Sequence, residues 1–196
     1  MKKLKLIILL VIFVGINTLN AQKRTIDVNA SSAEDYSPQS GDYLKNNKYD
    51  DFVGLYTYSN NNGTVFKMTL EKKIFYYKVS DAYFDRIFGS YEYKKENKNI
   101  VKKVDIIQKE KISLEDLKNN EPQISSIKLL EDNQMEIRII DKLNNKNLKG
   151  VLSKLDNGKY SLKISEEKGG INITAKKAQK SMTGMILPKE MTLIKE

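Results

Sequence analysis

The sequence predicts an all-β fold, an antiparallel meander of about ten strands that forms a closed or nearly closed barrel over residues 51–196. Three observations support this class. Short runs rich in Val, Ile, Phe, Tyr and Thr recur, mostly about 8 to 15 residues apart. Within several runs, apolar and polar residues alternate, as on a sheet with one buried face. Segments rich in Asn, Asp and Gly separate the runs and are typical of hairpin turns.

The N-terminal residues have the layout of a secretory signal peptide. Three lysines among the first five residues precede an apolar run over 6–16, and residues 17–21 turn polar and end on a small side chain. We expect cleavage between Ala21 and Gln22. The apolar run is too short for a membrane span, which needs about 20 residues, and no second such run follows. The sequence therefore predicts export to the periplasm or the extracellular medium, with no transmembrane segment.

Residues 22–50 are polar and interrupted by Pro and Gly, so we expect a mostly exposed lead-in, with Tyr36 and Tyr43 contacting the body. Strand patterning begins after it. In the run 64–70, Phe66, Met68 and Leu70 share one face while polar side chains occupy much of the other. The expected strands are 52–58, 64–70, 73–79, 87–93, 99–107, 125–130, 134–140, 147–155, 158–164 and 190–195. Closure into a barrel is favoured over a sandwich because it removes exposed sheet edges.

Turns and short helical segments complete the expected elements. Hairpin turns are predicted at 60–63, 131–133 and 156–158 from their Asn, Asp and Gly content. Single helical turns are predicted at Asp81–Arg86 and at Leu114–Lys118, where Ser113 is a candidate N-cap.

Composition excludes several classes of protein. The chain has no Cys, which excludes a disulfide framework and a lipobox cysteine, so no lipid anchor is expected. It carries 34 basic and 25 acidic residues, but the lysines are dispersed and arginines occur at only three positions. Because nucleic-acid binders usually cluster their basic residues, no nucleic-acid partner is expected.

The missing residue types also limit catalysis. No His is present, which removes the commonest general base and transition-metal ligand. The four acidic pairs lie beside turn-like residues and are interpreted as solvated carboxylates: Asp50–Asp51, Glu115–Asp116, Glu131–Asp132 and Glu166–Glu167. We therefore expect no enzyme, no cofactor and no metal site; a hydrolase using carboxylates or a Ser–Lys pair is the least favoured hypothesis.

Three segments resemble a family of small secreted flavobacterial (Bacteroidota) proteins of unknown function. They are GDYLKNNKYDDFVGLYTYSNNNGTVFKMTLEKK (41–73), IFGSYEYKKENKNIVKKVD (87–105) and LPKEMTLIK (187–195). This resemblance brings no activity and bears on fold and address only. More distantly, Gly54-Leu55-Tyr56 is similar to the Gly-x-Trp element that opens the first strand of lipocalins and caps the closed end of their barrel, with Tyr in place of Trp. The resemblance implies a lipocalin-like barrel shape.

Aromatic residues form the one constellation above background. The chain has 11 Tyr and 6 Phe, many of them in the N-terminal half. One interpretation is an ordinary core, because aromatic side chains favour strands and bury large areas. The other is an aromatic-lined cavity for a small apolar or amphipathic ligand, with Arg86 and Arg138 as candidate anion anchors. The candidate ligand-binding residues are Tyr56, Tyr58, Phe66, Met68, Phe75, Tyr77, Tyr91 and Arg138.

Two functional hypotheses follow. The first is an exported, non-catalytic barrel that binds a small apolar or amphipathic ligand in its interior. The alternative is an envelope or extracellular interaction module with a filled core, whose outer surface engages another envelope protein. A packed interior would favour the alternative, especially with an exposed apolar patch of several hundred Å².

Overall fold

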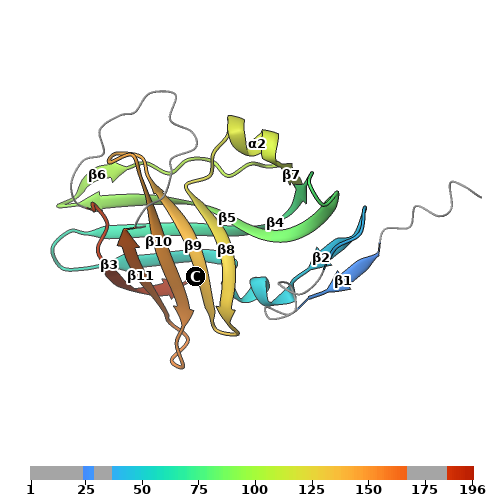
Figure 1. The fold of residues 1–196 in the computed structure, drawn as a ribbon. Helices are drawn as coiled ribbons and strands as arrows, with labels where there is room; N and C mark the ends of the chain where they lie inside the picture. Colours follow the sequence, from blue (N-terminus) through green and yellow to red (C-terminus); the bar gives the residue numbers. More distant parts are fainter. Residues whose placement is uncertain (1–23, 29–36, 167–184) are drawn as a thin grey trace, which may run out of the picture.

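The computed structural model describes residues 24–28, 37–166 and 185–196 and shows a closed β-barrel with extra strands at its sides (Figure 1). The predicted signal peptide, with its expected cleavage point, and Tyr36 lie outside the described residues. The elements are β1 (Thr25–Asp27), β2 (Tyr43–Lys45), η1 (Asn47–Phe52), β3 (Gly54–Ser59), β4 (Val65–Tyr77), β5 (Ala82–Lys95), β6 (Lys98–Val101), β7 (Lys111–Ser113), α2 (Leu114–Asn119), β8 (Ile124–Glu131), β9 (Gln134–Asp141), β10 (Lys146–Lys154), β11 (Tyr160–Glu166) and β12 (Glu190–Lys195).

Eight antiparallel strands close the barrel. They are β3, β4, β5 and β8 to β12, each paired with the next, and β12 pairs back with β3 through Ile194–Thr57 and Lys195–Tyr56. The predicted all-β class and antiparallel meander are therefore confirmed, and the closed barrel is consistent with the lipocalin-like shape. The hairpin turns predicted at 60–63, 131–133 and 156–158 connect β3 to β4, β8 to β9 and β10 to β11.

Side chains fill the interior of the barrel. Alternating residues of each strand point inward, so that Phe66, Met68 and Leu70 of β4 are all fully buried. The same cluster draws on every other barrel strand, including Tyr56, Tyr91, Ile124, Ile137, Leu152, Leu162 and Leu193. The interior is thus a continuous apolar core that stabilises the barrel.

One end of the barrel is closed by η1 and the side chains around it. The Tyr56 hydroxyl donates to the Phe52 carbonyl at 2.8 Å, and the Tyr160 hydroxyl donates to the Asp51 carbonyl at 2.8 Å. Lys195 Nζ donates to that same Asp51 carbonyl at 2.8 Å and lies 5.9 Å from the centroid of the Tyr56 ring. The Gly-x-aromatic element therefore begins β3 at a capped barrel end.

The β4–β5 hairpin is longer than the sequence predicts and extends past the barrel (Figure 1). The two strands predicted at 64–70 and 73–79 are one strand, because Glu71, Lys72 and Lys73 continue the ladder to β5. The helical turn predicted at Asp81–Arg86 is wrong, since residues 82–86 belong to β5 and pair with residues 73–77 of β4. These residues lack strict apolar alternation because the extended hairpin has no barrel interior to face.

Short strands attach to this extension. β2 pairs in parallel with β5 and carries β1, while β7 pairs in parallel with β4. Part of the polar lead-in thus adds to the sheet, with Leu44 buried and the Tyr43 hydroxyl donating to Asp85 at 2.6 Å. Of the strand predicted at 99–107, only residues 99–101 form one, as part of β6, which pairs with β5. The helical turn predicted after Ser113 is confirmed as α2.

Candidate functional site

The candidate site lies on the outer wall of the barrel, where β5 separates from β8. The two strands pair only at Phe88–Ser125 and Gly89–Ile124. Beyond this point β8 side chains and carbonyls replace the ladder: Ile87 N donates to Ser126 Oγ at 3.0 Å, and Arg86 Nη1 donates to the Ser126 carbonyl at 2.9 Å. These contacts hold the diverging strands at a defined separation.

Helix α2 lies across this region and is fixed at its N-terminus. Ser113 Oγ accepts from the Asp116 backbone N–H, and the Asp116 carboxylate accepts from the Ser113 N–H at 2.9 Å, which makes a capping box. The Lys109 ammonium also pairs with Asp116, and together with these bonds it lowers the pKa of the Asp116 carboxyl to about 2. The strand before α2, β7, is hydrogen-bonded to β4, so the helix is attached to the extended hairpin.

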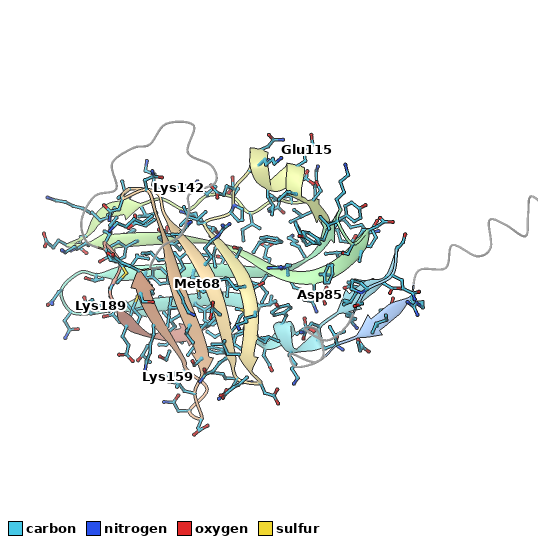
Figure 2. All side chains as sticks on the ribbon, in the orientation of Figure 1. Met68, Asp85, Glu115, Lys142, Lys159 and Lys189 are labelled. Carbon is cyan, nitrogen blue, oxygen red and sulfur yellow. The ribbon has the colours of Figure 1, made fainter. Side chains whose placement is uncertain are left out.

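Between α2 and the barrel wall is a cavity of about 470 Å³, the outer-wall cavity. Its volume falls in the range of small-molecule sites. It is lined by Phe75, Arg86, Phe88, Leu114, Leu117, Lys118, Glu121, Pro122, Ser125, Ser126, Ile127 and Arg138. In Figure 2, Glu115 marks α2 outside the barrel, whereas Met68 lies among the barrel strands.

The floor of the outer-wall cavity is apolar. Phe75 and Phe88 are 8% and 3% exposed, and their ring centroids lie 6.3 Å apart. With Ile106 and Ile112 they form a second hydrophobic cluster, separate from the barrel core, against which Leu117 packs. This cluster lies on the outer face of the same strands whose inner face forms the core.

Charged groups surround that floor. Arg86, Arg138 and Lys118 supply three cations and Glu121 supplies one carboxylate. Ser125 of β8 is the cross-strand partner of Phe88 on one side and of Arg138 on the other, so it lies between the strands that carry the two arginines. A guanidinium has five N–H donors. The cavity therefore combines an apolar surface with a cationic rim.

A second, smaller cavity lies on the other side of Arg86. It has a volume of about 340 Å³ and is lined by Val28, Leu44, Asn46, Tyr49, Phe84, Asp85, Arg86, Ile127, Lys128 and Leu129. Its carboxylate, Asp85, is already occupied: it accepts from the Tyr43 hydroxyl and from the Asn46 N–H at 2.9 Å. Burial raises the pKa of the Tyr49 phenol, which stays neutral at ordinary pH.

The sequence-predicted ligand residues divide among three environments. Tyr56, Phe66, Met68 and Tyr91 lie in the barrel core, and Tyr58 is half-buried against it. Phe75 and Arg138 line the outer-wall cavity. Tyr77 is 46% exposed, with its ring centroid 6.5 Å from that of Phe75. Two of the eight residues therefore meet in one cavity.

Sequence reasoning missed Phe88 and Leu117 as cavity residues, and it weighed Arg86 without placing it on the outer wall. A usable signal existed: Phe84, Arg86 and Phe88 share one face of β5, opposite the face that carries Ile87 and Tyr91. That alternation shows apolar residues on both faces of β5, which is typical of a strand covered on both sides.

Each carboxylate of the acidic pair Asp50–Asp51 forms an ion pair with a lysine. Asp50 pairs with Lys72, and Asp51 pairs with Lys154 at 3.3 Å. Within the part of the chain that the structure describes, no group of three or more His, Cys, Asp or Glu residues is placed to hold a metal ion. Of the helices in the same ranges, none is long and apolar enough to cross a membrane.

The fold and the cavity define the class: an eight-stranded antiparallel barrel with a filled interior and a cation-rimmed apolar cavity on its outer wall. The chain belongs to a family of unknown function, DUF6705, whose model matches residues 1–196. Comparison with curated proteins and with solved structures found no match.

Proposed function

We propose that this protein is an exported, non-catalytic binding protein that holds a small amphipathic ligand in the outer-wall cavity. The observation that carries the proposal is the cavity itself, a space of about 470 Å³ with Phe75 and Phe88 at its floor and polar groups at its rim. Small-molecule sites share this design, a mostly apolar lining with a few polar groups that orient the ligand.

The proposed ligand site lies outside the barrel, whereas the sequence alone suggested a site in the barrel interior. Tyr56, Phe66 and Met68 are fully buried in a continuous core, so their area is already used to stabilise the fold. The lining of the outer-wall cavity, in contrast, includes Leu114 at 55% exposure and Ile127 at 39%. A ligand there would cover apolar surface that the fold leaves open to water.

Export is supported by the first 21 residues and is part of the proposal. Intact-mass measurement of the protein recovered from an envelope or medium fraction of the native cells tests it. The expected mass is that of residues 22–196. A protein that retains residues 1–21, or that stays in the cytoplasmic fraction, would contradict export.

A carried ligand can be tested in the same sample by mass measurement under native conditions. We expect a discrete extra mass that is lost on denaturation.

Binding in the cavity can be tested with Nile red, a neutral dye whose fluorescence rises in apolar surroundings. Ser125 is a half-buried cavity residue on the outer face of β8, so Ser125→Trp fills the cavity. Ser153, half-buried on β10, is not among the cavity residues and provides the matched control, Ser153→Trp. We expect saturable dye binding to the native protein and to Ser153→Trp, and loss of binding in Ser125→Trp at an unchanged melting temperature. Equal dye binding by both variants would refute the cavity as the site.

The filled core and the tip of the extended hairpin favour the alternative, an interaction module for an envelope protein. Val79 and Tyr77 are 85% and 46% exposed beside Lys78, away from the barrel. Chemical cross-linking in intact cells tests this function. If Val79→Asp abolishes one defined cross-linked partner while Ser125→Trp leaves it intact, the hairpin tip is the functional surface. Loss with Ser125→Trp alone would point back to the cavity.

A further inference from the structure

We infer that the ligand of the outer-wall cavity is an amphipathic carboxylate, whose apolar body covers Phe75 and Phe88 and whose anionic head is bound by Arg86 and Arg138. The inference rests on the proposed function, because it names the chemical class of the ligand for the same cavity. Three features of the charged groups support it.

The first feature is the open state of Arg138. Within the residues that the structure describes, no group forms a hydrogen bond or ion pair with its guanidinium. The nearest carboxylate on the same face of β9 is Glu136, and it is paired with Lys149 at 2.6 Å. Arg138 therefore presents all its donors at the rim of an apolar cavity, where an arriving carboxylate can accept two of them in parallel.

The second feature is the position of Arg86. Among the described residues, its one hydrogen bond runs from Nη1 to the Ser126 carbonyl at 2.9 Å, and its guanidinium carbon lies 6.0 Å from the centroid of the Phe75 ring. Directly across the ladder on the same face is Lys73, a like charge. Like charges at paired positions of a sheet repel, and although Lys73 is bound to Glu71 at 2.8 Å, an anion beside Arg86 would relieve this repulsion.

The third feature is the spacing of the two arginines. β8 lies between β5 and β9, and at the paired residues Phe88, Ser125 and Arg138 the two outer strands are about 10 Å apart; Arg86 lies two residues beyond Phe88 on the same face of β5. Ser125, between them, lines the cavity and offers a hydroxyl donor. A carboxylate above Ser125 is within the reach of both long side chains. Lys118 adds positive charge at the rim and Glu121 opposes it, so the cations outnumber the carboxylates among the lining residues.

The test compares three probes with the same alkyl chain: decanoate, decanol and decylammonium. Each is titrated against the Nile red complex of the full native protein, at low and at high salt. We expect decanoate to displace the dye at about a tenfold lower concentration than decanol, with decylammonium weakest. The advantage of decanoate should shrink as salt rises, because the rim is partly exposed to solvent.

The decisive variant is Arg138→Met, which keeps an apolar stem and removes the guanidinium. It should weaken the binding of decanoate about tenfold and leave the binding of decanol unchanged. Lys159→Met removes one exposed charge from the β10–β11 turn and is the matched control for net charge. Arg86→Met should also weaken the binding of decanoate. Because it removes the hydrogen bond to the Ser126 carbonyl as well, its melting temperature must be compared with that of the native protein.

The outcomes separate the two claims. If decanol and decanoate displace the dye equally in the native protein, the carboxylate assignment is overturned and the proposed function stands. If Arg138→Met and Lys159→Met weaken decanoate equally, recognition reflects only net charge, and the assignment to Arg138 is overturned. If the native protein does not bind the dye and none of the three probes binds in direct calorimetry, the proposed function fails as well.

Discussion

Gly89 is a position at which an added methyl group should destabilise the fold strongly. It lies on β5, where it pairs with Leu70 of β4 on one side and with Ile124 of β8 on the other. A Cβ built there would stand 2.6 Å from the Thr69 carbonyl oxygen, 2.6 Å from Leu70 Cδ2 and 3.3 Å from Ile124 Cβ. Two of these neighbours are held by backbone and strand pairing, so the strands themselves must move apart.

We therefore expect Gly89→Ala to lower the free energy of unfolding by about 3 kcal/mol, the upper part of the range for overpacked cores. Gly150→Ala is the matched control. Its Cβ would stand 2.8 Å from Ile137 Cγ1, a side chain that can change rotamer, so we expect a loss of about 1 kcal/mol. For a domain of this size each kcal/mol lowers the melting temperature by about 2–4 °C.

The assay is urea unfolding of the native protein and both variants, followed by circular dichroism, with the midpoint and slope fitted separately. A midpoint for Gly89→Ala at or above that of Gly150→Ala would refute the reasoning, because it would show that β4 and β5 can separate there at little cost. Nile red binding provides a local measurement, because Gly89 adjoins the cavity residue Phe88 and a shift of β5 should weaken dye binding in Gly89→Ala.

Three further perturbations follow from the same contacts. Tyr56→Phe removes the buried hydrogen bond to the Phe52 carbonyl and should lower the unfolding free energy by about 1–2 kcal/mol in urea titrations. Burial raises the pKa of Tyr56 and Tyr91 above the ordinary value of 10.0, so the contribution of their neutral phenols to the free energy of unfolding is complete below pH 10 and is lost as pH rises further. In an alkaline titration, unfolding and tyrosinate absorbance should therefore appear together. Pairing with Lys109 lowers the pKa of Asp116 from 3.8 to about 2, so the contribution of its carboxylate to the stability of α2 is present above pH 3.8 and is lost as pH falls toward 2. The protection of α2 amides against exchange, relative to the intrinsic rate at each pH, should fall over that interval, and it should be lower at neutral pH in Asp116→Asn.

The barrel could be predicted from the sequence because its signals are local. Alternation in residues 64–70 and Asn- and Gly-rich turns such as 156–158 depend only on neighbouring residues. Prediction failed at 71–73 and 81–86, where the hairpin leaves the barrel. Residues 71–73 continue the ladder to β5, residues 83–84 also pair with β2, and residues 74–76 also pair with β7, so the extension is held by partners that local patterning does not reveal.

The candidate site was predictable only in part. Phe75 and Arg138 stood out as residue types, but periodicity gives no information on which wall of the barrel they occupy relative to one another. The cavity depends on α2, whose N-cap at Ser113 was predicted from the sequence, and the structure adds the reciprocal bond from Asp116. Its position over β5 and β8 was not, since that follows from the parallel pairing of β7 with β4.

The sequence by itself determined the all-β class, the antiparallel meander and the absence of His and Cys side chains, because alternation, turn composition and residue types are properties of the chain. Tertiary structure alone decided that the aromatic residues split between a filled core and an outer cavity. It also brought Arg86 and Arg138 to one cavity. The physical reason is register: Ser125 pairs with Phe88 on one side and Arg138 on the other, and a shift of one residue would turn these side chains to the opposite face.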